Sequence, residues 1–231
     1  MVPQGSNVTA SPREASSRSK AGRRSLLLLE FLGLFVAAPS LLYFLVPLPV
    51  VLLLWVFAVA CTRALMKDPE FDRANLWRGS ALAVRGTAML GRFAACGGAL
   101  AALVYFCAPH LLLDLPRQRP AIWLLIVLLY PLLSVYPQEL IYRTYFFHRY
   151  DTLFPRKWLL LTFSALTFGY GHIVYHNWIA VGLAAAGGAT FVVTYERSRS
   201  TLLVSIEHSL FGCLLFTLGL GRFFYSGHFS H

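Results

Sequence analysis

A glutamate and two histidines interrupt long apolar stretches of this sequence and could do chemistry together: Glu139, His172 and His208. An ionisable side chain inside an apolar segment costs free energy, usually faces other protein groups, and is a functional candidate for that reason. One carboxylate and two imidazoles can take a proton from water and stabilise an oxyanion. The structural alternative is that each side chain is only an interhelical hydrogen-bond partner. Their convergence on one cavity would favour catalysis.

The residues around these positions indicate how the side chains are arranged on helices. In the segment QELIYR, Glu139 and Arg143 are four residues apart and share a helical face, so the arginine could orient or neutralise the carboxylate. In FGYGH, Phe168 has the same spacing to the histidine. In EHSLFG, Gly212 leaves room beside the imidazole one turn earlier. Each segment therefore combines a reactive group with a neighbour that could position it.

The composition predicts a membrane protein. The 231 residues are 57% hydrophobic and only 13% charged, with a mean hydropathy of +0.61, which leaves too few charges to cover a soluble globule. The net charge of +10 could suggest nucleic acid, but membrane proteins carry Lys and Arg in their cytoplasmic loops. The sequence contains no recognisable nucleic-acid-binding module. We therefore expect a lipid bilayer as the surroundings and no nucleic acid as a partner.

The apolar runs predict an all-α, polytopic transmembrane bundle of about seven spans, within a range of six to eight. Most runs approach the ~20 residues that a helix needs to cross a bilayer. Residues 1–24 are rich in Ser, Arg and Pro and are expected to be a disordered basic tail. Residues 25–231 are expected to form the transmembrane domain, with its motifs at 120–220. The seven runs are 26–45, 48–66, 93–113, 121–150, 158–175, 178–195 and 201–220.

The distribution of Lys and Arg predicts the orientation in the membrane. Cytoplasmic loops carry an excess of these residues, and 17 of the 20 fall in the tail, in the connectors 63–92 and 143–157, or in the turn 196–200. With seven spans, the N-terminus is then cytoplasmic and the C-terminus lies on the other side. The connector sequence KDPEFDRANLWRGSALAVRG is typical of a helix along the membrane surface, and an ordinary charged loop fits it too.

The three candidate residues lie at similar depths in their spans. Counted from the expected cytoplasmic ends, Glu139, His172 and His208 are ~12 to 21 Å deep at ~1.5 Å per residue. Pro131 and Pro137 are expected to bend the long segment that carries the glutamate, which is a common way to open a polar pocket. We therefore expect the three side chains to line one cavity that opens to the cytoplasm.

The order E-x-x-x-R, F-x-x-x-H and then a third histidine motif resembles the CAAX-protease and bacteriocin-processing (CPBP) intramembrane proteases, relatives of the Rce1 prenyl-protein endopeptidase. The resemblance covers roughly residues 120–220. It implies an all-helical membrane bundle in which a glutamate and two histidines activate water to cut a peptide bond, without an obligatory metal. The matching positions are Glu139 and Arg143, Phe168 and His172, and His208.

Two departures from the family pattern affect the site. The first motif of the family usually has two glutamates, and its first position is Gln138 here. If the chain is active, either Glu139 serves as the base or the active site has changed. The third motif usually has Asn or Asp four residues after the histidine, where this chain has Gly212. A nearby donor, Asn177, His176 or Glu207, would then have to substitute, or this donor would have to be dispensable. FDRANLW and PQELIYR also resemble a bacterial branch that accompanies myxosortase-type C-terminal sorting systems.

These observations predict a glutamate-dependent intramembrane endopeptidase, a hydrolase without a cofactor. Glu139 would take a proton from water, His172 would position that water, His208 would donate to the oxyanion, and Arg143 would orient the carboxylate. The expected partner is a membrane-anchored peptide or protein substrate, cut near its anchored terminus in protein maturation or sorting-signal processing. The expected location is the bacterial inner membrane.

Three alternatives stay open from the sequence. Glu139, His172 and His208 also form a two-histidine, one-carboxylate set that could bind zinc, although the chain contains no HExxH motif. Gln138 and Gly212 are consistent with a catalytically degenerate scaffold or immunity protein. A transporter could use the same glutamate and histidines as a proton relay, but the sequence shows no inverted repeat.

Overall fold

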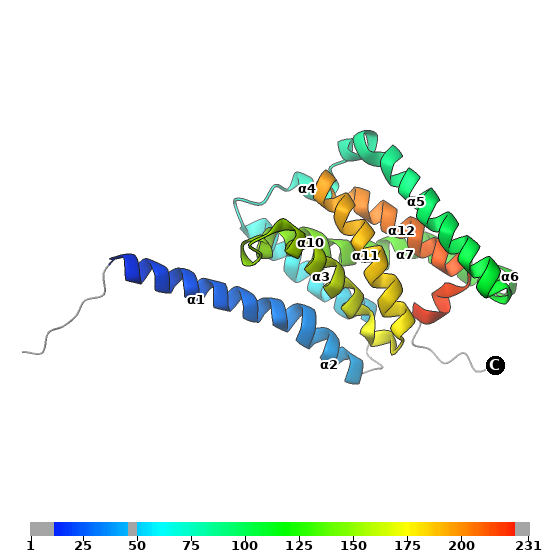
Figure 1. Cartoon of the computed structure of the whole chain (residues 1–231), viewed down its shortest axis with the longest axis horizontal. Helices are drawn as coiled ribbons and strands as arrows, with labels where there is room; N and C mark the ends of the chain where they lie inside the picture. The colour runs from blue at the N-terminus through cyan, green and yellow to red at the C-terminus, as the bar shows by residue number, and fades with distance from the viewer. Residues whose placement is uncertain (1–11, 46–49, 225–231) are drawn as a thin grey trace, which may run out of the picture.

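The computed structural model describes residues 12–45 and 50–224, and this part of the chain is helical without any strand (Figure 1). The α-helices are α1 (Pro12–Leu32), α2 (Ala38–Phe44), α3 (Val50–Lys67), α4 (Ala74–Trp77), α5 (Ser80–Cys107), α6 (Asp114–Gln118), α7 (Pro120–Tyr130), α8 (Tyr136–Glu139), α9 (Phe146–Tyr150), α10 (Lys157–Gly171), α11 (Trp178–Ser198) and α12 (Thr201–Thr217). The π-helical segments are η1 (Gly33–Ala37), η3 (Pro131–Val135) and η4 (Leu140–Tyr145), and the 3-10 segments are η2 (Pro109–Leu111), η5 (Asp151–Leu153), η6 (His172–Tyr175) and η7 (Leu220–Phe224).

The predicted polytopic helical bundle is confirmed. Within the described ranges, six continuous helical stretches are long and apolar enough to cross a membrane: Ala21–Phe44, Val50–Lys67, Ser80–Cys107, Pro120–Leu153, Lys157–Tyr175 and Trp178–Ser198. The seventh predicted run is the shorter apolar helix α12, whose 17 residues extend about 25 Å. Much of α12 packs inside the bundle, where a helix does not have to match the bilayer thickness. The chain is a multi-pass membrane protein.

Two boundaries differ from the sequence expectations. Helix α1 already begins at Pro12, so the expected disordered tail does not extend to residue 24, and only residues 1–11 lie outside the described part. Ala, Glu, Lys and Arg are good helix formers, which allows the helix to start within this polar sequence. The connector after α3 is also shorter than expected. Its C-terminal half forms the beginning of α5, and only the four-residue helix α4 remains between the two long helices.

Helices α10 and α11 approach closely because small residues face each other along their contact. A Cβ atom on Gly169 would come within 2.9 Å of the Ala185 Cα, and one on Gly188 would come within 3.1 Å of the Ala165 carbonyl oxygen. Small residues let helix backbones pack at short distance in membranes. This pair forms a rigid wall that carries His172 at its end.

The long segment from α7 to η5 changes its helical type where prolines interrupt the hydrogen-bond ladder. Segment η3 begins at Pro131, and the Tyr136 N–H donates to the Pro131 carbonyl five residues back. Pro137 has no N–H to donate, so the regular pattern cannot resume at once. A π-turn inserts an extra residue into the helical repeat, often at functional sites. The interruption decides which face the side chains after residue 135 present to the bundle.

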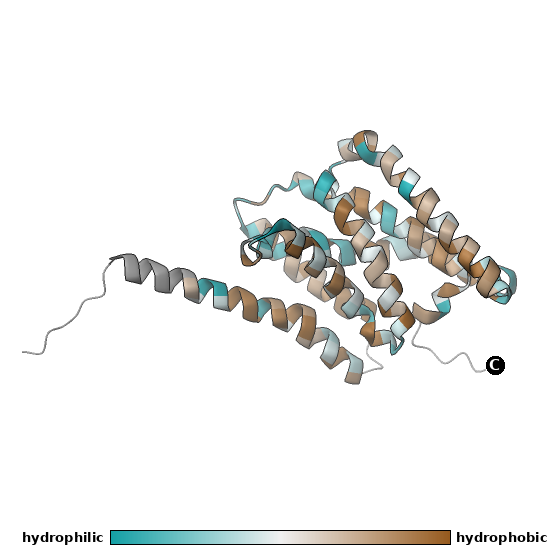
Figure 2. Cartoon of the chain, viewed as in Figure 1, coloured by the Kyte–Doolittle hydropathy of each residue, from teal (hydrophilic) through white to brown (hydrophobic). Residues whose placement is uncertain are grey.

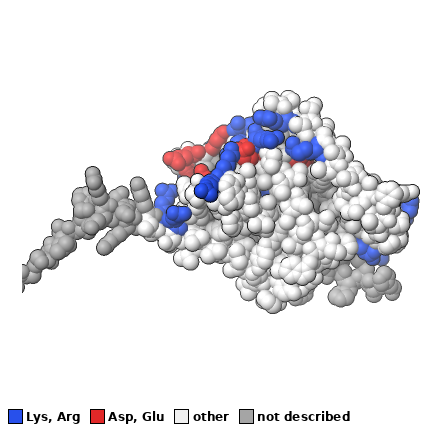
Figure 3. Space-filling model, in the orientation of Figure 1, with Lys and Arg blue, Asp and Glu red and all other residues white. Residues whose placement is uncertain are grey.

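Charged residues gather near one end of the bundle. Hydrophobic residues run along the long helices, and hydrophilic ones concentrate near α4 (Figure 2). In the space-filling view most of the visible Lys and Arg lie along the same edge (Figure 3). Arg92, which the sequence placed in a connector, lies on the long helix α5 and pairs with Glu207, and Arg143 pairs with Glu139 as expected. The orientation in the membrane that the Lys and Arg distribution predicts stays a prediction.

Candidate active site

Glu139 is completely buried at the end of α8 and is held from two sides. Its Oε1 atom lies 2.8 Å from the His208 Nδ1, and its Oε2 lies 3.5 Å from the Arg143 Nε. The Oε2 atom has no hydrogen-bond partner among the described residues. The predicted i,i+4 pairing with Arg143 is therefore present, and the first and third motifs meet at a glutamate–histidine hydrogen bond.

Arg143 fixes this pair to the α10/α11 wall. Its guanidinium is fully buried and donates to the Ser164 side chain at 3.1 Å and to the Gly188 carbonyl at 3.3 Å. The Phe168 ring lies 4.9 Å from the guanidinium carbon, in cation–π geometry. A buried cation with these partners neutralises the nearby carboxylate and holds it in one position.

His208 connects the buried glutamate to a cavity. Its Nδ1 faces Glu139, its Nε2 lies 3.0 Å from the Tyr130 hydroxyl, and its ring stacks on Phe191 at 4.6 Å between centroids. An ionised carboxylate can only accept, so the Nδ1 carries a proton and donates it to Glu139. The Nε2 is then the nitrogen that faces the cavity side. This order resembles the general arrangement in which a carboxylate orients a histidine.

His172 is oriented by the backbone of its own helix. Its Nδ1 lies 2.8 Å from the Phe168 carbonyl oxygen, so the Nδ1–H donates a hydrogen bond to that oxygen. In the neutral imidazole the lone pair is then on Nε2, the nitrogen that can accept a proton. The ring of Phe168 lies between the two histidines, 4.9 Å from His172 and 5.4 Å from His208. The backbone carbonyl at position 168 thus sets the tautomer of His172, and the Phe168 ring contacts both histidines.

Two cavities meet at the polar residues of this region. One has a volume of about 460 Å³ between α2, α3 and η4, and the other about 640 Å³ between α7, α11 and α12. Most of both linings is apolar. The residues that line both cavities include Ser134, Gln138, His172 and Tyr175. Of the three predicted catalytic side chains, His172 and His208 line the larger cavity and Glu139 lines neither.

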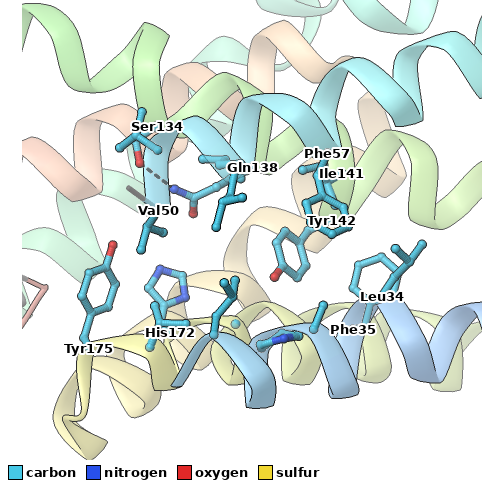
Figure 4. A pocket seen from close by; sticks show the side chains of 18 of the residues that line it. Leu34, Phe35, Val50, Phe57, Ser134, Gln138, Ile141, Tyr142, His172 and Tyr175 are labelled. Atoms are coloured by element: carbon cyan, nitrogen blue, oxygen red, sulfur yellow. Dashed lines mark hydrogen bonds between the residues drawn. The ribbon is translucent and has the colours of Figure 1, made fainter. Parts of the chain in front are cut away.

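Gln138 lines both cavities, whereas the adjacent Glu139 lines neither. Its amide nitrogen donates to the Ser134 hydroxyl at 2.7 Å, and its Oε1 has no hydrogen-bond partner in the described part of the chain. Figure 4 shows Gln138 and His172 pointing toward one another across the smaller cavity. The residue before Glu139 therefore presents its side chain to the cavity, while Glu139 itself points into the protein.

The remaining predicted residues have other positions. Asn177 accepts hydrogen bonds from the Ile179 and Ala180 amides and caps helix α11. His176 stacks on Tyr43, 4.0 Å between centroids. Glu207 pairs with Arg92, and its other oxygen accepts from Thr194. None of these three candidate donors is a partner of His208 in the described contacts.

The sequence reasoning missed Tyr130 and Ser134. Both line the larger cavity. The Tyr130 hydroxyl is hydrogen-bonded to His208, and the Ser134 hydroxyl accepts from the Gln138 amide. Their signal was present: Tyr130, Ser134 and Gln138 are polar residues spaced by four in an otherwise apolar run, which places them on one helical face.

A comparison with known families finds a match over the part of the chain that carries these motifs. Residues 117–214 match the family model described as type II CAAX prenyl endopeptidase Rce1-like. This segment, called the Rce1-like segment below, is therefore similar to that family. The Rce1-like segment extends from α6 to α12 and contains all three motifs, and the matched family is described as one of endopeptidases. No curated protein and no solved structure matches the chain.

The Rce1-like site has no preformed metal centre in the residues that the structure describes, where no group of three His, Cys, Asp or Glu side chains could hold an ion. The Glu139 Oε1 and the His208 Nδ1 face each other at 2.8 Å instead of converging on a common point. Both the zinc hypothesis and the expectation of a cofactor-free reaction stay predictions.

Proposed function

We propose that this protein is an intramembrane endopeptidase that requires Glu139 but uses it through His208. The observation that carries the proposal is the placement of two histidines on one cavity, one of them hydrogen-bonded to a buried carboxylate. The sequence predicted that Glu139 itself takes the proton from water. Because its carboxylate has no exposed surface and lines neither cavity, the proposal gives it a positioning role instead.

His172 is the proposed general base. Its Nδ1 is occupied by the Phe168 carbonyl, which leaves the Nε2 lone pair for a water molecule. The uncommitted Gln138 Oε1 across the cavity could accept the second hydrogen of that water. Together these groups would hold a water molecule by both hydrogens and direct its oxygen lone pair at a carbonyl carbon.

His208 supplies the charge that stabilises the reaction. When the histidine is protonated on both nitrogens, Glu139 accepts from Nδ1 and balances the positive charge. The protonated ring then favours negative charge that develops on a substrate carbonyl oxygen in the cavity. A water-poor, apolar lining strengthens this interaction.

The proposed reaction is a balanced hydrolysis. The His172 Nε2 takes a proton from water as the water oxygen forms a bond to the carbonyl carbon, and the carbonyl oxygen becomes the oxyanion. The carbon–nitrogen bond then breaks, and the proton on His172 passes to the leaving amine nitrogen. The products are a carboxylic acid terminus and an amine terminus, which ionise in water. No oxidant, cofactor or metal is needed in this sequence.

The proposed substrate is a peptide segment close to a membrane-anchored terminus, because the cavities lie among membrane-spanning helices and have mostly apolar linings. The proposed location is the bacterial inner membrane, with the N-terminus cytoplasmic. Labelling of single cysteines at positions 20 and 228 from either side of the membrane tests the orientation. Reaction of residue 20 only from the outside, and of residue 228 only from the cytoplasm, would reverse it.

The deciding experiment compares the termini of membrane proteins in cells that produce the wild type, His172→Ala or His148→Gln. His148 pairs with Asp68 and lines neither cavity, so it is a control histidine. We expect termini that are processed with the wild type and with His148→Gln but stay unprocessed with His172→Ala, at equal protein levels. Identical termini in all three strains would contradict the proposal and favour a scaffold, which the replacement of a cavity carboxylate by Gln138 would explain.

A further inference from the structure

Gly212 and Tyr130 share one space beside His208. A Cβ atom built on Gly212 would overlap the Tyr130 ring and lie only 2.6 Å from the hydroxyl oxygen. Real Cβ atoms do not approach other atoms so closely, and both ring edge and hydroxyl are involved. A side chain at position 212 and Tyr130 in its present place therefore exclude each other. Tyr130 can occupy this position because residue 212 has no side chain.

The tyrosine that fills this space brings a hydroxyl to the cavity. The Tyr130 oxygen lies 3.0 Å from the His208 Nε2, and the residue lines the same cavity as Gln138 and His172. Its ring packs edge-on against Phe216 at 5.7 Å between centroids, which helps to fix its orientation. A phenylalanine would fill the same volume, so packing alone does not account for a hydroxyl at this position.

We propose that the Tyr130 hydroxyl donates the hydrogen bond to the substrate oxyanion, in place of a side chain at position 212. When His208 carries a proton on Nε2, that N–H donates to the Tyr130 oxygen. The phenolic hydrogen is then free to point into the cavity, where it donates to the developing oxyanion. Protonated His208, which is hydrogen-bonded to Glu139, polarises the Tyr130 hydroxyl and so strengthens its hydrogen bond to the substrate oxyanion. The inference rests on the endopeptidase function proposed above.

The first test removes only the hydroxyl. Tyr130→Phe keeps the ring and its packing, and we expect processing of the termini that depend on His172 to slow by ~10² to 10³-fold, the typical effect of losing one oxyanion donor. Tyr136→Phe is the matched control, since this tyrosine is on the same long segment and lines neither cavity. Its ring stacks on Trp77, which phenylalanine can still do, and its hydroxyl donates a long 3.5 Å hydrogen bond to the Leu76 carbonyl. This control should process at the wild-type rate.

The second test exchanges the two side chains. Gly212→Asn alone should reduce both activity and the thermal midpoint, because the new side chain collides with Tyr130. Tyr130→Ala alone should lose activity by removing the donor. The double variant Tyr130→Ala/Gly212→Asn has room for an amide donor beside His208, and we expect it to regain at least tenfold in processing rate over either single variant. A merely structural tyrosine would give recovery of the thermal midpoint without recovery of the rate.

The outcomes separate this inference from the proposed function. If some termini depend on His172 but Tyr130→Phe processes them at the wild-type rate, the donor role of Tyr130 is wrong and the endopeptidase proposal stands. If no terminus depends on His172, both proposals are wrong. Slow processing by Tyr130→Phe with an unchanged thermal midpoint, together with recovery in the double variant, would support the donor role.

Discussion

Two glutamates are completely buried in the Rce1-like part of the bundle, and their surroundings differ in one respect that separates structure from chemistry. Glu207 has both oxygens satisfied: Oε1 accepts from Arg92 at 2.9 Å, and Oε2 accepts from Thr194. Glu139 has one oxygen on His208 and leaves the other without a hydrogen bond in the described contacts. Burial alone does not distinguish the two acids.

The partners of the two glutamates show the difference. Arg92 and Thr194 line neither cavity, so the Glu207 cluster ends in the protein and near the surface of α5. The partner of Glu139 is a histidine that lines the larger cavity. Intramembrane acids are usually expensive and often functional, but only the acid that is connected to a cavity through a titratable group can influence a bound substrate. The comparison predicts opposite phenotypes for equivalent substitutions.

Glutamine at each position gives the largest expected contrast. Glu139→Gln removes the negative charge that balances protonated His208, and we expect processing to slow by ~10² to 10⁴-fold, the range for loss of an acid–base group. Glu207→Gln should keep most of the activity per folded molecule. The measurement is the rate of terminus processing in cells, normalised to the amount of each variant in the membrane.

The thermal midpoint of each purified variant in detergent is the control for this contrast. A lower midpoint for Glu207→Gln with a normal processing rate is the expected structural phenotype. Wild-type processing by Glu139→Gln at a normal protein level would remove the distinction between the two acids and leave Glu139 as a structural residue.

Replacing Arg143 should destabilise the protein more than replacing Arg92. Arg143 is fully buried, and Arg143→Ala strands the Glu139 carboxylate, so we expect a loss of about 3 to 5 kcal/mol of stability. The Arg92 side chain is 29% exposed, and Thr194 still serves Glu207 without it, so Arg92→Ala should cost less. Thermal unfolding of the two variants in the same detergent measures the difference. Equal midpoints would show that burial of the guanidinium does not set its contribution.

Much of this comparison could be read from the sequence. The three motifs, the Glu139–Arg143 pair and the polytopic bundle follow from spacing and hydropathy, because helical periodicity fixes which residues share a face. Glu207 faces a different partner from His208 because adjacent residues on a helix differ by about 100° in direction. Its partner Arg92 comes from α5, 115 residues away, in a stretch that looked like a connector.

The direction in which Gln138 and Glu139 face could not be predicted. It depends on the π-helical turns on either side of α8, which shift the side chains relative to a regular helix. The exchange between Tyr130 and Gly212 was also hidden, because a glycine reveals what fills its space only after the helices are packed. Both features result from tertiary contacts that local periodicity does not encode.

Gln138→Glu is expected to change the processing rate least among these variants. The substitution places a carboxylate on the cavity opposite His172, where the amide now donates to Ser134. Beside the neutral His172 it could act as a second base for water, so we expect processing to stay at the wild-type level or to rise several-fold, in contrast to the loss in Glu139→Gln. Gln138→Ala, which leaves the cavity without a polar group at this position, is the matched control and should reduce the rate only modestly. A loss in Gln138→Glu as large as that in Glu139→Gln, with the protein level unchanged, would mean that the cavity needs a neutral side chain at position 138 and would remove the proposed role of this position in holding water.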